Sequence, residues 1–193
     1  MADVTFFFDP SCPWTWRASR WLTTVAAARG LEIEWRPFSL LVLNDGKPDE
    51  KHRVEMHAAH RGLRLIEQLA RAGRQDDITR LYTVIGELAH EGGAPVDDDL
   101  IGHAVHQAGL DADAATLDDR ALDTGVEQST STALASVGPG VGSPIMILAG
   151  AERGLHGPVL KSIPEKTESL ALWTAVEALA PVDEFFELKR GRR

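Results

Sequence analysis

The residue best placed to do chemistry is the single cysteine, Cys12, which lies between an apolar run that ends at Phe8 and an amphipathic stretch that begins at Pro13. Proline suits the first position of a helix because its missing N–H would have no partner there. We therefore expect Cys12 at the N-cap of a helix, where unpaired N–H groups and the helix dipole favour thiolate over thiol. This placement predicts a reactive thiol with a pKa below that of free cysteine.

Two features of the sequence weigh against that interpretation. Asp9 is close to Cys12 in sequence and would raise the pKa of the thiol if its carboxylate pointed toward the sulfur. A small buried cysteine that merely precedes a helix would also give the same pattern.

The segments on either side of Cys12 have the pattern of a β-α-β unit. Val4 to Phe8 is a short apolar run typical of a buried strand. Apolar residues recur at helical spacing from Ala18 to Ala26, and Gly30 stands where a helix ends. Leu31 to Trp35 alternates apolar with polar residues, as a strand does. The helix is long enough for a crossover to a parallel strand.

The rest of the chain predicts a helical block followed by a hairpin and a last helix. Residues 44–136 carry apolar stripes at helical spacing, which predict four or five helices. Strand patterns return at Ile145 to Leu148 and around Leu155 to His156, and a final amphipathic helix stops near Pro181. We therefore predict an α/β protein with a thioredoxin-like fold, β-α-β then β-β-α, and a large helical insertion. Residues 1–43 and 137–193 would form the thioredoxin-like domain and residues 44–136 the insertion.

Composition limits the partners and the compartment. The chain has 193 residues, 44% of them hydrophobic, and a formal net charge of -9. An acidic surface repels nucleic acid and anionic membranes, so we expect neither as a partner. We find no apolar stretch of membrane-spanning length and no secretory signal. With a lone cysteine, which excludes an internal disulfide, these features predict a cytoplasmic protein.

The segment Phe7 to Trp16, which reads FFDPSCPWTW, resembles the active-site segment of DsbA-like oxidoreductases. The segment Gly142 to Ile145 resembles their cis-proline loop. The similarity is closest to the actinobacterial mycothiol-dependent nitroreductases, with further matching segments within residues 39–44, 81–93, 157–164 and 185–190. It covers nearly the whole chain.

This resemblance implies a thiol-disulfide oxidoreductase with Cys12 as nucleophile. It also implies a low-molecular-weight thiol such as mycothiol as the reductant, and disulfide or nitro compounds as substrates. The residues that it places around the thiol and substrate are Pro13, Trp14, Asn44, His90, Ser143 and Pro144, and Arg64 also falls on a matching position. The bond between Ser143 and Pro144 is expected to be cis.

One position departs from the family pattern. The family usually has a second, resolving cysteine where this chain has Thr15. A dithiol enzyme ejects a mixed disulfide by attack of its second thiol, so this chain must instead rely on an outside thiol. We expect a monothiol enzyme in which the Thr15 hydroxyl either hydrogen-bonds to the thiolate or simply lies on the helix surface.

Other functions remain open from the sequence. His57 with His60, and His103 with His106, have no third ligand at a recognisable spacing, so no metal is expected. The glycine-rich stretch 137–142 lacks the ending of a phosphate loop, and no nucleotide motif is evident. The alternative function is that of a kappa-type glutathione transferase or hydroxychromene-carboxylate isomerase. A third hypothesis is a non-catalytic peptide-binding module. The sequence is compatible with a monomer or a homodimer.

Overall fold

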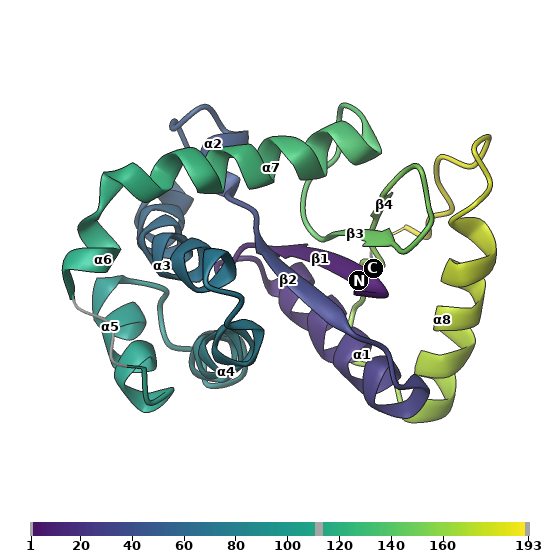
Figure 1. Cartoon of the computed structure of the whole chain (residues 1–193), viewed down its shortest axis with the longest axis horizontal. Coiled ribbons are helices and arrows are strands. Elements are labelled where there is room, and N and C mark those ends of the chain that lie inside the picture. Colours follow the sequence, from purple (N-terminus) through teal and green to yellow (C-terminus); the bar gives the residue numbers. More distant parts are fainter. Residues whose placement is uncertain (1, 111–113, 192–193) are drawn as a thin grey trace.

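The computed structural model describes residues 2–110 and 114–191, and its centre is a four-stranded sheet with the order β2-β1-β3-β4 (Figure 1). The central strand β1 (Val4–Phe8) pairs in parallel with β2 (Ile33–Pro37). On its other side β1 pairs antiparallel with β3 (Ile145–Leu148), and β3 pairs antiparallel with the short edge strand β4 (Leu155–His156). These strands confirm the thioredoxin-like α/β fold that the sequence predicts.

The crossover between β1 and β2 is α1 (Pro13–Arg29), which places its N-terminus at the end of β1. The helix stops at Gly30, whose φ of 71° lies in the left-handed region that glycine enters without steric cost. Helix α8 (Lys166–Leu179) packs beside α1, and Trp21 Nε1 donates a hydrogen bond of 3.1 Å to the carbonyl of Ser169.

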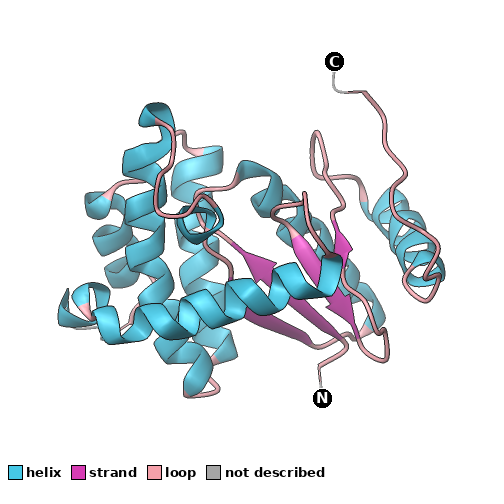
Figure 2. Ribbon diagram, turned by 90° about the horizontal axis from the view of Figure 1, so that it is seen from above, coloured by secondary structure: helices cyan, strands magenta, loops and turns pink. Residues whose placement is uncertain are grey.

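Helices fill the long stretch between β2 and β3 and gather at one end of the sheet (Figure 2). They are α2 (Leu40–Leu43), α3 (Arg53–Arg71), α4 (Gln75–Gly86), α5 (Asp98–Gln107), α6 (Ala114–Asp118) and α7 (Asp123–Val137), with short turns η1 (Glu50–His52), η2 (Glu87–Glu91, a π-helical turn) and η3 (Arg120–Leu122). Helix α7 runs back from this end toward β3 (Figure 1).

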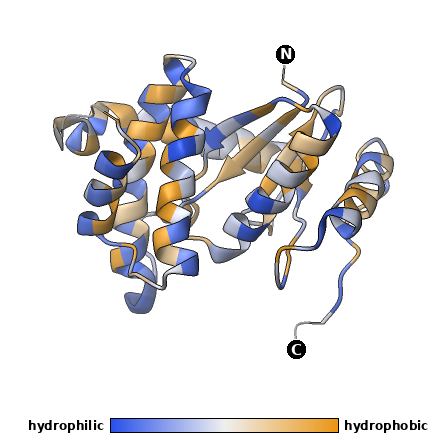
Figure 3. Ribbon diagram, turned by 90° about the horizontal axis from the view of Figure 1, so that it is seen from below, coloured by the Kyte–Doolittle hydropathy of each residue, from blue (hydrophilic) through white to orange (hydrophobic). Residues whose placement is uncertain are grey.

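The sheet and the helical region share the larger of two hydrophobic clusters. Phe8 of β1 stacks on Tyr82 of α4 with ring centroids 4.1 Å apart, and Trp16 of α1 contacts the same tyrosine edge-on at 5.6 Å. Polar and apolar residues alternate along the helices in Figure 3, which fits helices that bury one face and expose the other. Among the described residues, none of the helices combines the length and the apolar character needed to cross a membrane.

Candidate active site

Cys12 lies at the N-cap of α1, as the Cys12-Pro13 order predicts. Its backbone is extended, with φ -88° and ψ 111°, and Pro13 occupies the first helical turn. The Cys12 N–H donates to the carbonyl of Asp9 at 3.1 Å, and the Cys12 carbonyl accepts from the N–H of Trp16 at 3.0 Å. Only 7% of Cys12 is exposed, so the residue is buried in the turn that precedes α1.

Two hydroxyl groups stand together at the position where a dithiol enzyme would have its second sulfur. Thr15 is fully buried, and its Oγ1 lies 2.5 Å from Oγ of Ser143, a residue 128 positions away in the chain. The Ser143–Pro144 peptide bond is cis, in agreement with the expectation from the sequence. Thr15 is therefore not a helix-surface residue, and it links the start of α1 to the loop before β3.

The predicted low pKa of the Cys12 thiol is wrong for this structure. Burial raises the pKa of Cys12 above its ordinary value, and the nearby carboxylate of Asp9 raises it further. The hydroxyl and N–H of Thr15 and the N–H of Trp14 lower it, but together by less than burial and Asp9 raise it. The sequence shows that a helix begins at Pro13, but it does not show that Cys12 and Asp9 are both buried.

Trp14 and Arg17 lie together on the first turn of α1. The Trp14 side chain is half-buried, and the Arg17 guanidinium lies 4.9 Å from the centre of its ring. Arg17 was not predicted as a site residue, although its position three residues after Trp14 on a helix places both on one face. The pair puts an aromatic ring and a positive charge beside the turn that carries Cys12.

His90, in the turn η2, contacts the same turn from the helical region. Its Nε2 lies 2.9 Å from the carbonyl of Pro10, so Nε2 carries the proton and donates it. Burial lowers the pKa of His90, although the hydrogen bond to Pro10 opposes that shift. His90 is thus fixed to Pro10, which lies two residues before Cys12, and the resemblance makes His90 a thiol-binding residue.

Asn44 and Arg64 are engaged elsewhere. Asn44 is exposed at the end of α2, where its Nδ2 donates to the carbonyl of Leu40 at 2.7 Å. Arg64 is buried and forms a two-pronged ion pair with Asp123 at 2.6 and 3.1 Å. Its Nη1 also donates to the carbonyl of Leu117, so Arg64 fastens α3 to the segment that leads into α7.

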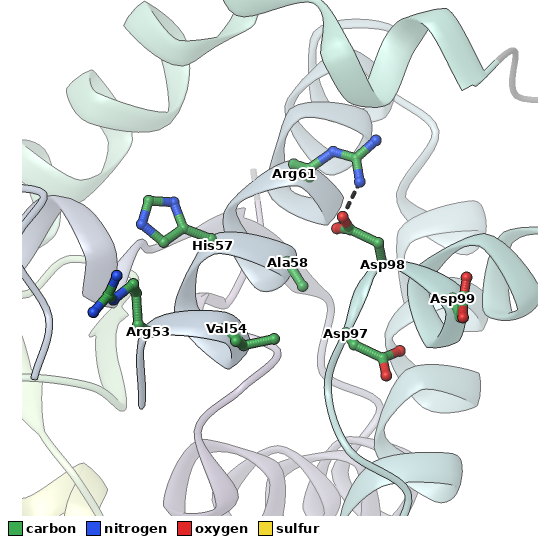
Figure 4. Close-up of a pocket in the computed structure, with 8 residues that line it drawn as sticks. All are labelled: Arg53, Val54, His57, Ala58, Arg61, Asp97, Asp98 and Asp99. Atoms are coloured by element: carbon green, nitrogen blue, oxygen red, sulfur yellow. Dashed lines mark ion pairs between the residues drawn. The ribbon is translucent and has the colours of Figure 1, made fainter. Parts of the chain in front are cut away.

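No cluster of three or more histidine, cysteine, aspartate or glutamate side chains that could hold a metal ion occurs in the described part of the chain. A pocket of about 430 Å³ lies between α3 and α5, close to His57 and apart from Cys12. Figure 4 shows its lining, in which Arg61 faces Asp98 with an ion pair of 2.6 Å. The lining residues are Arg53, Val54, His57, Ala58, Arg61, Asp97, Asp98 and Asp99.

Comparison with known proteins agrees with this geometry. The family model described as "Rv2466c-like: Mycothiol-dependent nitroreductase Rv2466c" matches residues 11–190. The chain belongs to the Rv2466c-like family. It is therefore a thiol-dependent oxidoreductase with a DsbA-like fold.

Individual relatives extend the comparison. The chain is 34% identical over 199 residues to "Uncharacterized protein Rv2286c" of Mycobacterium tuberculosis, covering 100% of this chain and 83% of that protein. A probable DsbA oxidoreductase, SCO1869 of Streptomyces coelicolor, has a TM-score of 0.57 at 20% identity, covering 98% of this chain and 94% of that one. A 2-hydroxychromene-2-carboxylate isomerase has a TM-score of 0.60 at 18% identity, covering 91% and 95%. At these identities the two structures show the shared fold alone.

Proposed function

We propose that the protein is a monothiol thiol-disulfide oxidoreductase in which Cys12 is the nucleophile. The observation that carries this proposal is the contact between Thr15 and Ser143 beside Cys12, because it fills the place of a resolving thiol with two hydroxyl groups. The chain belongs to a family of thiol-dependent enzymes, yet it has one cysteine. Cys12 is therefore the one protein thiol through which the whole reaction has to pass.

The reaction has two exchanges. In the first, the Cys12 thiolate attacks one sulfur of a disulfide, forms a mixed disulfide and releases the other sulfur as a thiolate. Thr15 has no sulfur and does not expel the bound half. In the second exchange an outside thiolate attacks the bound half's sulfur, forms a new small disulfide and returns Cys12 as thiolate.

The hydroxyl pair favours both exchanges because each passes through a Cys12 thiolate. We propose that the Thr15 hydroxyl donates a hydrogen bond to that thiolate while it accepts one from Ser143. Hydrogen bonds to a charged group contribute about 1.5–3 kcal/mol, which is enough to offset part of the cost of ionising a buried thiol. On this account Thr15 assists Cys12 directly.

The remaining residues would shape the thiol-binding site. We propose that Pro13, Trp14 and Pro144 border the sulfur and that the backbone of Ser143 pairs with the half of the substrate disulfide bound to Cys12. His90 would fix the turn that carries Cys12 through its hydrogen bond to Pro10. Asn44 keeps its amide oxygen as an acceptor for a bound thiol, because its bond to Leu40 uses only an N–H of Nδ2.

We propose a low-molecular-weight thiol, with mycothiol as the candidate, as the source of electrons in the cytoplasm. Two molecules of this thiol would become one disulfide and supply two electrons and two protons. A nitro substrate would then become a nitroso compound and one water, and a disulfide substrate would become two thiols. Nucleic acid and membrane are not proposed as partners, and a monomer or a homodimer would serve equally.

A mass measurement tests the proposal against its alternative. The reduced protein is incubated with oxidised low-molecular-weight thiols, and its intact mass is determined. One adduct per chain at Cys12 supports the oxidoreductase. The alternative is a kappa-type transferase or isomerase, in which the same hydroxyl pair would hold a thiol without bonding to it covalently. Activation of a bound thiol with no adduct would support that alternative and contradict our proposal.

A further inference from the structure

Asp9 is the one acidic residue that is fully buried beside Cys12, among the residues that the structure describes. Its Oδ1 accepts hydrogen bonds from the N–H of Ser11 at 2.8 Å and from the hydroxyl of Ser11 at 2.6 Å. Its Oδ2 accepts from the N–H of Leu40 at 2.7 Å. These contacts give the carboxyl group donors on both oxygens, which is the pattern that suits an ionised carboxylate.

This carboxylate does not assist ionisation of the thiol. A negative charge near Cys12 raises the pKa of the sulfur, and burial raises the pKa of Asp9 itself. The charge of Asp9 therefore makes the Cys12 thiolate less stable, so it does not explain why an acidic residue stands next to the nucleophile. Its hydrogen bonds must explain the arrangement instead.

The three hydrogen bonds join two separate parts of the molecule. Ser11 belongs to the turn that carries Cys12, whereas Leu40 is the first residue of α2. The N–H of a first helical residue has no partner within its own helix, so Asp9 satisfies a donor that would otherwise be unpaired. Asp9 thus holds the turn with the nucleophile against the start of α2.

Beyond Leu40, the contacts continue into the helical region. Ser39 Oγ lies 2.9 Å from Nδ1 of His60, and Nε2 of His60 lies 3.0 Å from Asp123. The N–H of Ser39 also donates to the hydroxyl of Thr130 in α7 at 3.0 Å. The start of α2 is therefore fixed to both α3 and α7, and it gives Asp9 a rigid point of attachment.

We propose that Asp9 is a positioning residue that fixes the Cys12 turn to α2 and so holds the sulfur in register with Thr15 and Ser143. The proposal rests on the function proposed above, because it assigns Asp9 a role in the reactivity of Cys12. Asp9 itself does not touch the reacting sulfur atoms in this account.

A matched pair of variants at Leu40 tests the connecting bond. Leu40→Pro removes the N–H from which Asp9 accepts a hydrogen bond, at the helix position that tolerates proline best. Its neighbour Ser39 is already extended, with φ -107° and ψ 117°, as a residue before proline must be. Leu40→Ala removes the same side chain but keeps the N–H, so the two variants differ in that N–H and in the ring carbon that replaces it next to Asp9.

The measurement is the rate at which Cys12 forms a mixed disulfide with 5,5′-dithiobis(2-nitrobenzoate), followed across pH to its plateau. We expect the plateau rate of Leu40→Pro to be about tenfold below that of Leu40→Ala, because small displacements of reacting groups have large effects on rate. A purely structural role would change the denaturation midpoints of both variants but leave their plateau rates equal. Equal plateau rates in two folded variants would overturn the proposal.

A second variant covers the case in which Leu40→Pro does not fold. Ser11→Ala removes one bond to Asp9 from a half-exposed side chain, and we expect a smaller reduction of the plateau rate in the same direction. An unchanged rate in Ser11→Ala would then overturn the role of Asp9. The function proposed for Cys12 is tested separately, because a wild-type protein that forms no adduct at all would contradict that function rather than the role of Asp9.

Discussion

Thr15 is the residue that most distinguishes this chain from dithiol enzymes, and its contact with Ser143 gives it a testable role. The hydroxyl of Thr15 lowers the pKa of Cys12. Thr15→Val removes that hydroxyl, so the pKa of Cys12 should rise and alkylation by iodoacetamide at pH 8 should slow by about tenfold. Thr15→Ser keeps the hydroxyl and is the matched control. Superimposable pH profiles for the Val variant and wild type would contradict a role for this hydroxyl.

Thr15→Cys should convert the protein from a monothiol to a dithiol form. The two positions are three residues apart at the start of a helix, which places the second sulfur within reach of the first. With an oxidised low-molecular-weight thiol as the oxidant, we expect the variant to form an internal disulfide, seen as a loss of two hydrogen atoms in intact mass, and to retain no adduct with a small thiol. An adduct as persistent as that of wild type would contradict this geometry.

Among single residues, the sequence predicted the position of Cys12, left open whether Thr15 faces the thiol or the helix surface, and gave the wrong direction for the pKa shift of Cys12. The position follows from local rules about proline at a helix start. The pKa depends on how deeply Cys12 and Asp9 are buried, which is decided by elements far away in the chain. Ser143 was identified by resemblance, and its contact with Thr15 required the folded structure.

The four strands were predictable from short apolar or alternating runs, and the first and last helices from apolar residues at helical spacing that end near a glycine or a proline. Helix α2 was not predicted. Its four residues are too few to show a period, and its start is fixed by Ser39 and by the distant carboxylate of Asp9. The division into a thioredoxin-like domain of residues 1–43 and 137–193 and an insertion of residues 44–136 stays a proposal.

The packing of α1 against α4 has a tight point at Gly86. A methyl group there would lie 2.1 Å from the Trp16 ring. Gly86→Ala should therefore reduce the free energy of unfolding by about 2 kcal/mol, as overpacked core substitutions do. Urea denaturation measures this. Gly102→Ala in α5 is the control, since nothing lies within 4 Å of the added methyl group, and it should stabilise by about 0.5–1 kcal/mol. Equal effects of the two changes would contradict the packing described.

The free energy of unfolding of the whole molecule should fall at acid pH because of the ion pair between Arg64 of α3 and Asp123 of α7. Burial raises the pKa of Asp123, but the bonds from Arg64 and His60 outweigh it and lower the pKa below 3.8. A carboxyl group whose pKa is lower in the folded than in the unfolded protein stabilises the fold at a pH above its unfolded-state pKa. This contribution is lost as the pH falls through the folded-state pKa. Asp123→Asn should reduce the free energy of unfolding by about 2 kcal/mol at pH 7.

The pH dependence of the difference between wild type and Asp123→Asn is the control for this prediction. The difference between wild type and Asp123→Asn should shrink as the pH falls below 3.8, because both then carry a neutral group at this position. Urea denaturation at several pH values measures it. A difference that is the same at pH 7 and at pH 3 would show that the loss comes from packing rather than from charge.

The most direct test of the account is thiol-dependent turnover by Cys12→Ser, with circular dichroism to show that the variant is folded. Serine is a good N-cap residue, so the fold should be kept. We expect wild type to take up one low-molecular-weight thiol per chain and to turn over when excess thiol is added. Cys12→Ser should show neither adduct nor turnover. Full thiol-dependent turnover by the folded Cys12→Ser protein would contradict the account.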